Sequence, residues 1–339
     1  MKTEPETLSL CVIALNEEAF LPSLLEDLRN QTYDHALTEI ILVDSGSSDG
    51  TRALMEAFSA SHDFRRVQIA DNPGKTQPAG WNVALDAACC EVVARIDAHG
   101  RIPPDYSRLV MEDIRSGEDV VGGPCVRVAA KDRPWCRVLL EAENAMFGSG
   151  FSLSRRGRER RYVATVSKPA YRREVFRRVG RFNETLLRTE DNEIHYRIRQ
   201  AGYRILLDPR IRTSLVSRCD LSSMLRQKHQ NGYWVGRTFR VCPGCLSLYH
   251  FAPFFFLLAL VSAFLLCIPG FCLPLIVLLI LYGLFALGSM ILSMIHDGFA
   301  PLQFLLPVLF FLLHVTYGWG TCQGLLSGKR FEGGRPWHS

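Results

Sequence analysis

Short apolar runs alternate with stretches of helical length in the first part of the chain. The runs, which are rich in β-branched residues, cover residues 8–15, 39–43, 67–70 and 92–96. The intervening stretches with a helical pattern cover residues 19–29, 51–61 and 78–88. This alternation predicts an α/β domain over residues 1–215, in which a mostly parallel sheet carries helices on both faces.

The last third of the chain has a different pattern. Three apolar blocks, at residues 251–268, 271–295 and 300–326, approach or exceed the roughly 20 residues that a membrane helix needs. Asp297 is the only formally charged residue between positions 251 and 326, which argues against the alternative of a helical bundle in a soluble protein. We expect two to three membrane crossings over residues 251–326, after a basic linker with interfacial helices (216–250) and before a polar tail (327–339).

The charges that flank the apolar blocks leave the topology open. Arg237 and Arg240 precede the first block, and Lys329, Arg330 and Arg335 follow the last. Three crossings would put these clusters on opposite sides, against the positive-inside rule. Either one block is re-entrant or the rule fails here. Because the first residues are polar and acidic and lack a signal-peptide pattern, we expect a multi-pass protein of the inner (cytoplasmic) membrane with its catalytic domain in the cytoplasm.

Charge and cysteine content refine this picture. The net charge of +5 suits a domain that rests near anionic lipid headgroups. The basic run at residues 155–161 lacks interleaved aromatic residues, so we expect a mobile loop and no nucleic-acid partner. The 11 cysteines follow no regular framework and are predicted to be reduced. Cys242 and Cys245 form a CxxC without a second close pair, which favours a chance pair over a zinc site.

Polar loops follow three of the predicted strands, at residues 16–18, 44–51 and 97–99. Ligands of open α/β sheets bind beyond the carboxyl ends of the strands, so these loops are expected to share one crevice. In the second loop, small residues such as Ser45 permit close approach of a ligand to the backbone, and Asp44 can accept from a nucleotide base or ribose. Asp49 either contacts the ligand or caps the next helix.

Two further acidic segments suggest chemistry. Asp97 and His99 lie on the same side of an extended chain and can reach one divalent cation, which would neutralise a pyrophosphate leaving group. Glu190, Asp191 and Glu193 open a predicted helix. They either stabilise the helix dipole or supply a base for an acceptor hydroxyl, with Asp191 or Glu190 as the candidate.

Taken together, these segments resemble a known family. Asn16-Glu17-Glu18, residues 44–51, Asp97-Ala98-His99 and Thr189-Glu190-Asp191 occur in the order found in the inverting, GT-A-fold family 2 glycosyltransferases. Residues 72–75, Asn82, 95–99, 121–124 and 172–176 are similar to the branch that includes succinoglycan-biosynthesis glucosyltransferases. The resemblance covers residues 8 to about 238.

The resemblance implies a GT-A fold and a uridine-diphosphate sugar held by Asn16, Glu17 and Asp44. It also implies a metal at Asp97 and His99 and Asp191 as the catalytic base. His99 stands where many relatives have a second carboxylate, so Mn²⁺ is as suitable as Mg²⁺. Beside these residues, Ser45 is a further donor contact, and Lys75 and Arg95 are cations that can meet the diphosphate.

Many relatives carry a Gln-x-x-Arg-Trp motif that grips acceptor and diphosphate. Here Gln230 and Trp234 fall near that spacing without the arginine, which favours addition of a single sugar over processive synthesis. An interfacial role for Trp234 is the alternative.

We therefore expect a membrane-bound enzyme that transfers one sugar, from a UDP-hexose, to a lipid-linked saccharide with inversion. Its setting would be exopolysaccharide or cell-surface glycan synthesis, with other polysaccharide-assembly proteins as partners. Two alternatives stay open: a polyprenyl-phosphate sugar synthase, and a non-catalytic membrane assembly factor that binds nucleotide sugars.

Overall fold

The computed structural model describes residues 7–129, 132–145, 147–148, 157, 159–217 and 219–327. The tail from residue 328 onward and part of the basic run at 155–161 lie outside these residues. The described chain divides into two compact units. One comprises residues 7–126 and 157–216, and the other comprises residues 127–148 and 217–327.

The first unit is built on an eight-stranded sheet with the order β3-β2-β1-β4-β9-β6-β10-β8. Its parallel half consists of β1 (Leu8–Ala14), β2 (Thr38–Asp44), β3 (Arg66–Asp71) and β4 (Val92–Asp97). The other half consists of β6 (Val120–Gly123), β8 (Arg161–Tyr162), β9 (Ser167–Arg172) and β10 (Ile205–Leu207). Strand β9 runs antiparallel to both β4 and β6. The predicted α/β fold with a mostly parallel sheet is confirmed.

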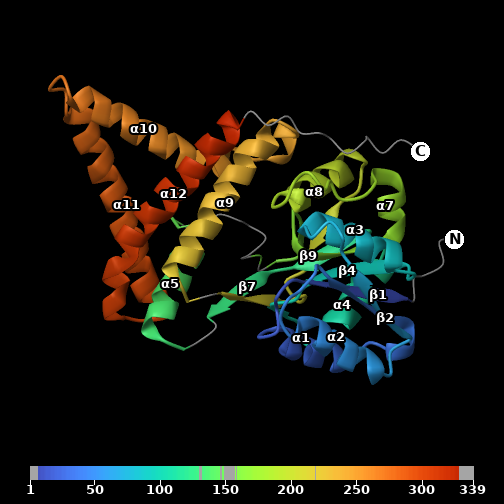
Figure 1. Ribbon diagram of the computed structural model, residues 1–339. Coiled ribbons are helices and arrows are strands. Elements are labelled where there is room, and N and C mark those ends of the chain that lie inside the picture. Colours follow the sequence, from blue (N-terminus) through green and yellow to red (C-terminus); the bar gives the residue numbers. More distant parts are fainter. Residues whose placement is uncertain are drawn as a thin grey trace. The chain divides into compact units, whose positions relative to one another are not determined.

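Helices cover both faces of this sheet (Figure 1). One face packs against α1 (Leu21–Arg29), α2 (Thr51–Ala60) and α4 (Tyr106–Arg115). The other packs against α3 (Gln77–Ala87), α7 (Arg173–Val179) and α8 (Glu190–Gln200). Strand β1 contributes Leu10 and Val12 to the first core and Cys11 to the second, because successive side chains of a strand point to opposite faces.

A smaller three-stranded sheet has the order β5-β11-β7, with β5 at Gly100–Arg101, β7 at Cys125–Ala129 and β11 at Thr213–Ser217. The second unit contains the helices α5 (Pro134–Asn144), α9 (Leu221–Phe239), α10 (Ala252–Cys267), α11 (Leu273–Asp297) and α12 (Leu306–Leu326). Within the described residues, three helical segments are long and apolar enough to cross a membrane: Leu248–Cys267, Leu273–Asp297 and Pro301–Leu326.

Four cysteines are paired, so the expectation that all cysteines are reduced was wrong. Cys136 is bonded to Cys219, and Cys267 is bonded to Cys272 in the turn between α10 and α11. The first pair is separated by 83 residues and is joined only because the fold brings α5 beside the segment that precedes α9. No spacing rule in the sequence indicates such a pair.

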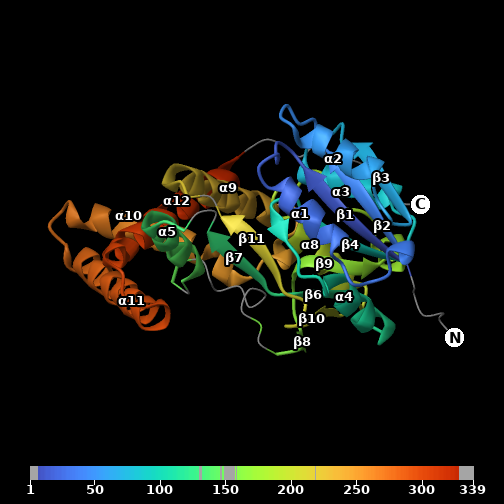
Figure 2. The ribbon, with the colours of Figure 1, turned by 90° about the horizontal axis from the view of Figure 1, so that it is seen from below.

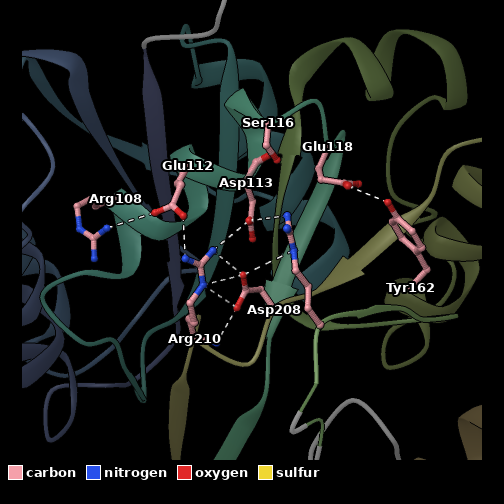
Figure 3. Close-up of polar contacts among 9 residues, drawn as sticks. Arg108, Glu112, Asp113, Ser116, Glu118, Tyr162, Asp208 and Arg210 are labelled. Carbon is pink, nitrogen blue, oxygen red and sulfur yellow. Dashed lines mark hydrogen bonds and ion pairs between the residues drawn. The ribbon is translucent and has the colours of Figure 1, made fainter.

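A buried carboxyl pair joins α4 to the end of β10 (Figure 3). The side chains of Asp113 and Asp208 are each 1% exposed. The Arg210 guanidinium lies 2.8 Å from an Asp208 oxygen and 3.4 Å from Asp113. Arg160 donates a 3.0 Å hydrogen bond to Asp113 and so ties the start of β8 to the same cluster. Burial and the neighbouring Asp208 carboxylate raise the pKa of Asp113 to about 6.

This cluster predicts a pH-dependent stability. Folding raises the pKa of Asp113, so the folded chain favours its protonated carboxyl. The stabilisation from this carboxyl is fully present below its pKa in the unfolded chain and is lost as the pH rises through about 6. Asp113→Asn keeps the acceptor for Arg160 but cannot ionise. We expect the variant to gain roughly 1–2 kcal/mol over the native chain between pH 4.5 and pH 7.5. Thermal unfolding midpoints at both pH values test this, with Glu112→Gln as the control. If the midpoints of the variant and the native chain differed by the same amount at both pH values, the prediction would be contradicted.

Candidate active site

The carboxyl ends of β1, β2 and β4 lie side by side in the sheet (Figure 2). Asp44 ends β2 and is paired in register with Ala14, while Asp97 ends β4 and is paired with Ile13. Neighbouring strands are about 4.8 Å apart, so the two carboxylates flank β1 at a backbone separation of roughly 10 Å. The three loops predicted to share a crevice therefore start from one edge of the sheet.

The loop after β1 is hydrogen-bonded to the loop after β2. The backbone N–H of Asn16 donates to Ser47 Oγ at 3.0 Å, and Asn16 Oδ1 accepts from the backbone N–H of Ser48 at 2.8 Å. Glu18 accepts from the backbone N–H of Gly50 at 3.0 Å. Asn16 has a φ of 55°, in the left-handed region that asparagine tolerates better than most residues. In this structure Asn16 shapes the loops that surround Asp44.

The β2 loop holds Asp44 and Ser45 in buried positions. Asp44 Oδ1 accepts from the backbone N–H of Ser47 at 3.0 Å, and Ser45 Oγ accepts from Asn72 at 2.9 Å. Asp49 accepts from the backbone N–H of Thr51, the first residue of α2, at 3.0 Å. Hydrogen bonds from Thr51 lower the pKa of Asp49. Asp49 thus serves the start of α2, which favours the capping alternative over the ligand alternative.

Lys75 brings a cation to the same edge. Its backbone φ is 52°, and its side chain lies over Gly46, where an added Cβ atom would be 3.4 Å from Lys75 Cε. Gly46 itself has a φ of 84°, which side-chain-bearing residues rarely adopt. The two unusual backbone positions together place the lysine chain beside the Asp44 loop.

The candidate metal ligands, Asp97 and His99, lie at the end of β4 and in the loop that follows it. His99 Nδ1 lies 3.1 Å from Glu17 Oε1, and the other oxygen of Glu17 is buried without a hydrogen-bond partner among the described residues. In the described part of the chain, no three His, Cys, Asp or Glu side chains form a metal-binding group. Proteins commonly bind Mg²⁺ through one or two carboxylates plus substrate phosphates. The carboxylate of Asp97 and the imidazole of His99 are ligand types that suit Mg²⁺ or Mn²⁺, and their role at a metal stays a prediction.

Arg95 and Glu190 form a buried ion pair that positions the start of α8. Arg95 Nη2 lies 3.3 Å from Glu190 Oε1, and both side chains are less than 10% exposed. The Arg95 guanidinium also lies over the rings of Trp81, at 4.3 Å, and Phe182, at 4.8 Å. Arg95 therefore contacts α8 and two aromatic rings, and its contact with a diphosphate stays a prediction.

Asp191 is more accessible than Glu190, since it is only half-buried. Its Oδ1 accepts from the backbone N–H of Asn192 at 2.8 Å. Burial raises the pKa of Asp191, the charge of Arg95 opposes this, and the charge of Asp97 adds to it. Burial likewise raises the pKa of Glu190, and the neighbouring Asp191 charge adds to the effect. Arg95 lies on β4 and contacts Glu190, so it links the strand that ends at Asp97 to the start of α8.

Sequence reasoning missed His195, which anchors α8 to the sheet. Its ring is fully buried, with Nδ1 2.8 Å from Thr165 Oγ1 and Nε2 3.1 Å from the hydroxyl of Tyr171 on β9. Burial lowers the pKa of His195 to about 3, so the ring is neutral at physiological pH. In the sequence, the feature that could have indicated His195 was its position one helical turn after Asp191.

Gln230 and Trp234 lie on α9, in the second unit. Gln230 is exposed, and Trp234 follows one turn later. At 100° per residue, both lie on the side of the helix opposite Gly232 and Gly236. Their role at an acceptor or diphosphate stays a prediction.

The chain is similar to known proteins both in sequence and in fold. The model of the family described as glycosyl transferase family 2 matches residues 9–180. The chain is 34% identical over 214 residues to the succinoglycan biosynthesis protein ExoA of Rhizobium meliloti (strain 1021). That match covers 62% of this chain and 63% of ExoA, which is less than two thirds of either protein.

A second relative matches nearly the whole chain. It is the dolichyl N-acetyl-alpha-D-glucosaminyl phosphate 3-beta-D-2,3-diacetamido-2,3-dideoxy-beta-D-glucuronosyltransferase of Methanococcus voltae. This protein is 23% identical over 331 residues, which cover 95% of this chain and 98% of the relative. Among solved structures, the mannosyltransferase PcManGT from Pyrobaculum calidifontis, in complex with GDP-Man and Mn²⁺, has a TM-score of 0.59 and 16% identity. The match covers 97% of this chain and 89% of PcManGT and shows a shared fold.

Proposed function

The chain belongs to glycosyltransferase family 2, and on this premise we propose that it transfers one sugar from a UDP-hexose to a lipid-linked saccharide with inversion. The observation that carries the proposal is the grouping of acidic side chains at one edge of the sheet. Asp44 and Asp97 flank β1, and the Arg95–Glu190 pair links β4 to the start of α8, where Asp191 lies. Asp44 suits the hydrogen-bond donors of a nucleoside, Asp97 suits a cation that neutralises a leaving diphosphate, and Asp191 suits an attacking hydroxyl that must lose a proton.

The donor would lie across the ends of β1, β2 and β4. Asp44 and Ser45 meet the nucleoside, in a loop that Asn16 and Glu17 hold in place through Ser47, Ser48 and Thr51. Lys75, over Gly46, meets the diphosphate. Asp97, with His99, would hold a divalent cation, Mg²⁺ or Mn²⁺, which when bound neutralises charge on the departing diphosphate.

Asp191 is the better base of the two α8 carboxylates. Glu190 is 3% exposed and held by Arg95, so an acceptor hydroxyl cannot approach it without breaking that pair. Asp191 is half-buried, and its raised pKa brings it nearer to the value at which a general base is most effective. The acceptor oxygen forms its bond to the anomeric carbon, its proton passes to Asp191, and the bond to the diphosphate breaks. This single displacement inverts the anomeric centre.

The acceptor proposal rests on the membrane helices and on the relatives. Three apolar helical segments follow the catalytic domain, which suits an acceptor that is held in a bilayer. The Methanococcus voltae relative is named for a dolichyl phosphate-linked sugar, and ExoA for succinoglycan biosynthesis. By analogy with both relatives, we propose that this chain acts on a lipid-linked saccharide acceptor in exopolysaccharide or cell-surface glycan synthesis. Gln230 and Trp234 would contact that acceptor.

The test uses the purified full chain in lipid with labelled UDP-hexoses and Mn²⁺. One arm contains a polyprenyl-diphosphate-linked saccharide, and the other contains polyprenyl phosphate. The proposal predicts a lipid product heavier by one hexose in the first arm alone. Product in the polyprenyl phosphate arm alone would identify a polyprenyl-phosphate sugar synthase instead. Longer products would indicate a processive synthase.

The donor site predicts a contrast between two aspartates of one loop. Asp44→Asn removes a buried carboxylate that faces the nucleoside, so we expect affinity for UDP-sugar to fall by about 10–100-fold, equivalent to the roughly 1.5–3 kcal/mol of a charged hydrogen bond. Asp49→Asn should leave the affinity unchanged, because asparagine caps helices as well as aspartate does. Titration calorimetry with UDP-sugar measures both. Equal losses in the two variants would contradict the assignment of Asp44.

A further inference from the structure

Helices α9 and α12 pack against each other along most of their length (Figures 1 and 2). A Cβ atom added to Gly232 or Gly236 of α9 would overlap the carbonyl oxygen of Tyr317 or Thr321 of α12. The contact is reciprocal. A Cβ atom on Gly320 or Gly324 of α12 would overlap the carbonyl oxygen of an α9 residue, His229 or Tyr233 respectively. Backbone contact of this kind, through Gly-x-x-x-Gly spacing on both helices, binds the two helices closely together.

Polar contacts extend the pairing to the ends of both helices. His229 Nε2 lies 2.7 Å from Gln323 Oε1. Arg237 donates to Ser327 Oγ at 2.8 Å, and Arg240 donates to the carbonyl oxygen of Ser327 at 2.6 Å. The helices therefore run in the same direction and end together. Any position that α12 takes relative to a bilayer is shared by α9.

Helix α9 is too polar to be favoured in the hydrocarbon core of a bilayer. Residues 226–231 are all polar, and Arg226 and Gln230 are exposed. An arginine at the centre of a membrane helix costs about 2.5–3.5 kcal/mol for insertion. Lys228 adds a second charge, which is buried against Glu143 of α5 at 3.0 Å. Helix α12 is apolar enough to cross, but its polar partner would have to cross with it.

Helix α12 lies in a segment that is more buried within the protein than the other two apolar segments. In the most apolar window of Pro301–Leu326, 33% of the residues are buried in the protein, against 11% for the segments that contain α10 and α11. The segment Leu248–Cys267 has 20 residues and α11 has 25. At 1.5 Å per residue these lengths suffice for the roughly 30 Å of hydrocarbon. The turn between them is closed by the Cys267–Cys272 bond, so they form a hairpin.

We infer that only α10 and α11 cross the membrane, and that α9 and α12 lie together along the surface of the bilayer. The exposed apolar residues of α12, Val308, Trp319 and Leu326, would enter the lipid, and Arg226 and Gln230 of α9 would face headgroups and water. With two crossings, the end of α12 returns to the side of α9. Arg237 and Arg240 then share one side with Lys329, Arg330 and Arg335, as the positive-inside rule requires.

Reporter fusions in a bacterial host test this topology on the full chain. Alkaline phosphatase, which is active only in an oxidising compartment, and green fluorescent protein, which fluoresces in the cytoplasm, are each fused after Ser339 or inserted at Gly270. We expect phosphatase activity at Gly270 alone and fluorescence at the chain end alone. Phosphatase activity with no fluorescence at the chain end would show that α12 crosses and would overturn the inference. The end fusion decides the matter even if the insertion disturbs the hairpin.

Discussion

Asp191→Asn is expected to slow sugar transfer by about 10²–10⁴-fold, the usual contribution of a general base. Asparagine keeps the acceptor for the backbone N–H of Asn192 but cannot take a proton. Donor affinity should stay at the native value, because Asp191 acts on the acceptor. The native rate should also fall as the pH drops through the raised pKa of Asp191, since the base is then protonated. Initial rates with UDP-sugar and lipid-linked saccharide across pH measure both effects.

Glu193→Gln is the matched control for this experiment. Glu193 lies in the same turn of α8, but its carboxylate is bound to Arg197 at 2.6 Å. We expect a rate within about 3-fold of native. Transfer at the native rate in Asp191→Asn would contradict the base assignment and would favour an acceptor whose oxygen is already anionic, such as polyprenyl phosphate.

Arg95→Met is expected to lower the free energy of unfolding of the catalytic domain by about 3–5 kcal/mol, because it leaves the buried Glu190 without its cation. Contacts of the guanidinium with Trp81 and Phe182 are lost as well. The thermal midpoint of the full chain in detergent should fall by roughly 6–20 °C.

A second substitution separates the ion pair from the packing. Glu190→Gln in the Arg95→Met background removes the unpaired charge, so we expect it to recover part of the lost stability while the same change in the native chain is destabilising. Additive effects of the two substitutions would show that Arg95 and Glu190 do not interact. A native midpoint in Arg95→Met would contradict the structural role of the pair.

The parallel half of the sheet was predictable because its signals are local. Strands β1, β2 and β4 were found within one or two residues of their bounds, since each is a buried apolar run followed by a polar loop. Once the strands are parallel, their carboxyl ends must share an edge, so the proximity of Asp44 and Asp97 also followed from the sequence.

Contacts between distant segments could not be predicted. Arg95 and Glu190 are 95 residues apart, and nothing in either segment indicates the other. The Cys136–Cys219 bond depends on α5 packing with the helices of the second unit. The apolar pattern of α12 indicated a membrane helix, and its glycine contacts with α9 become visible only in three dimensions.

The stereochemistry of the new glycosidic bond tests the central claim most directly. A single displacement with Asp191 as base converts a sugar that is α-linked to diphosphate into a β-linked product. The coupling constant of the anomeric proton in the purified lipid product, measured by NMR, reports the configuration. We predict one added β-linked residue. An α-linked residue would contradict the single displacement.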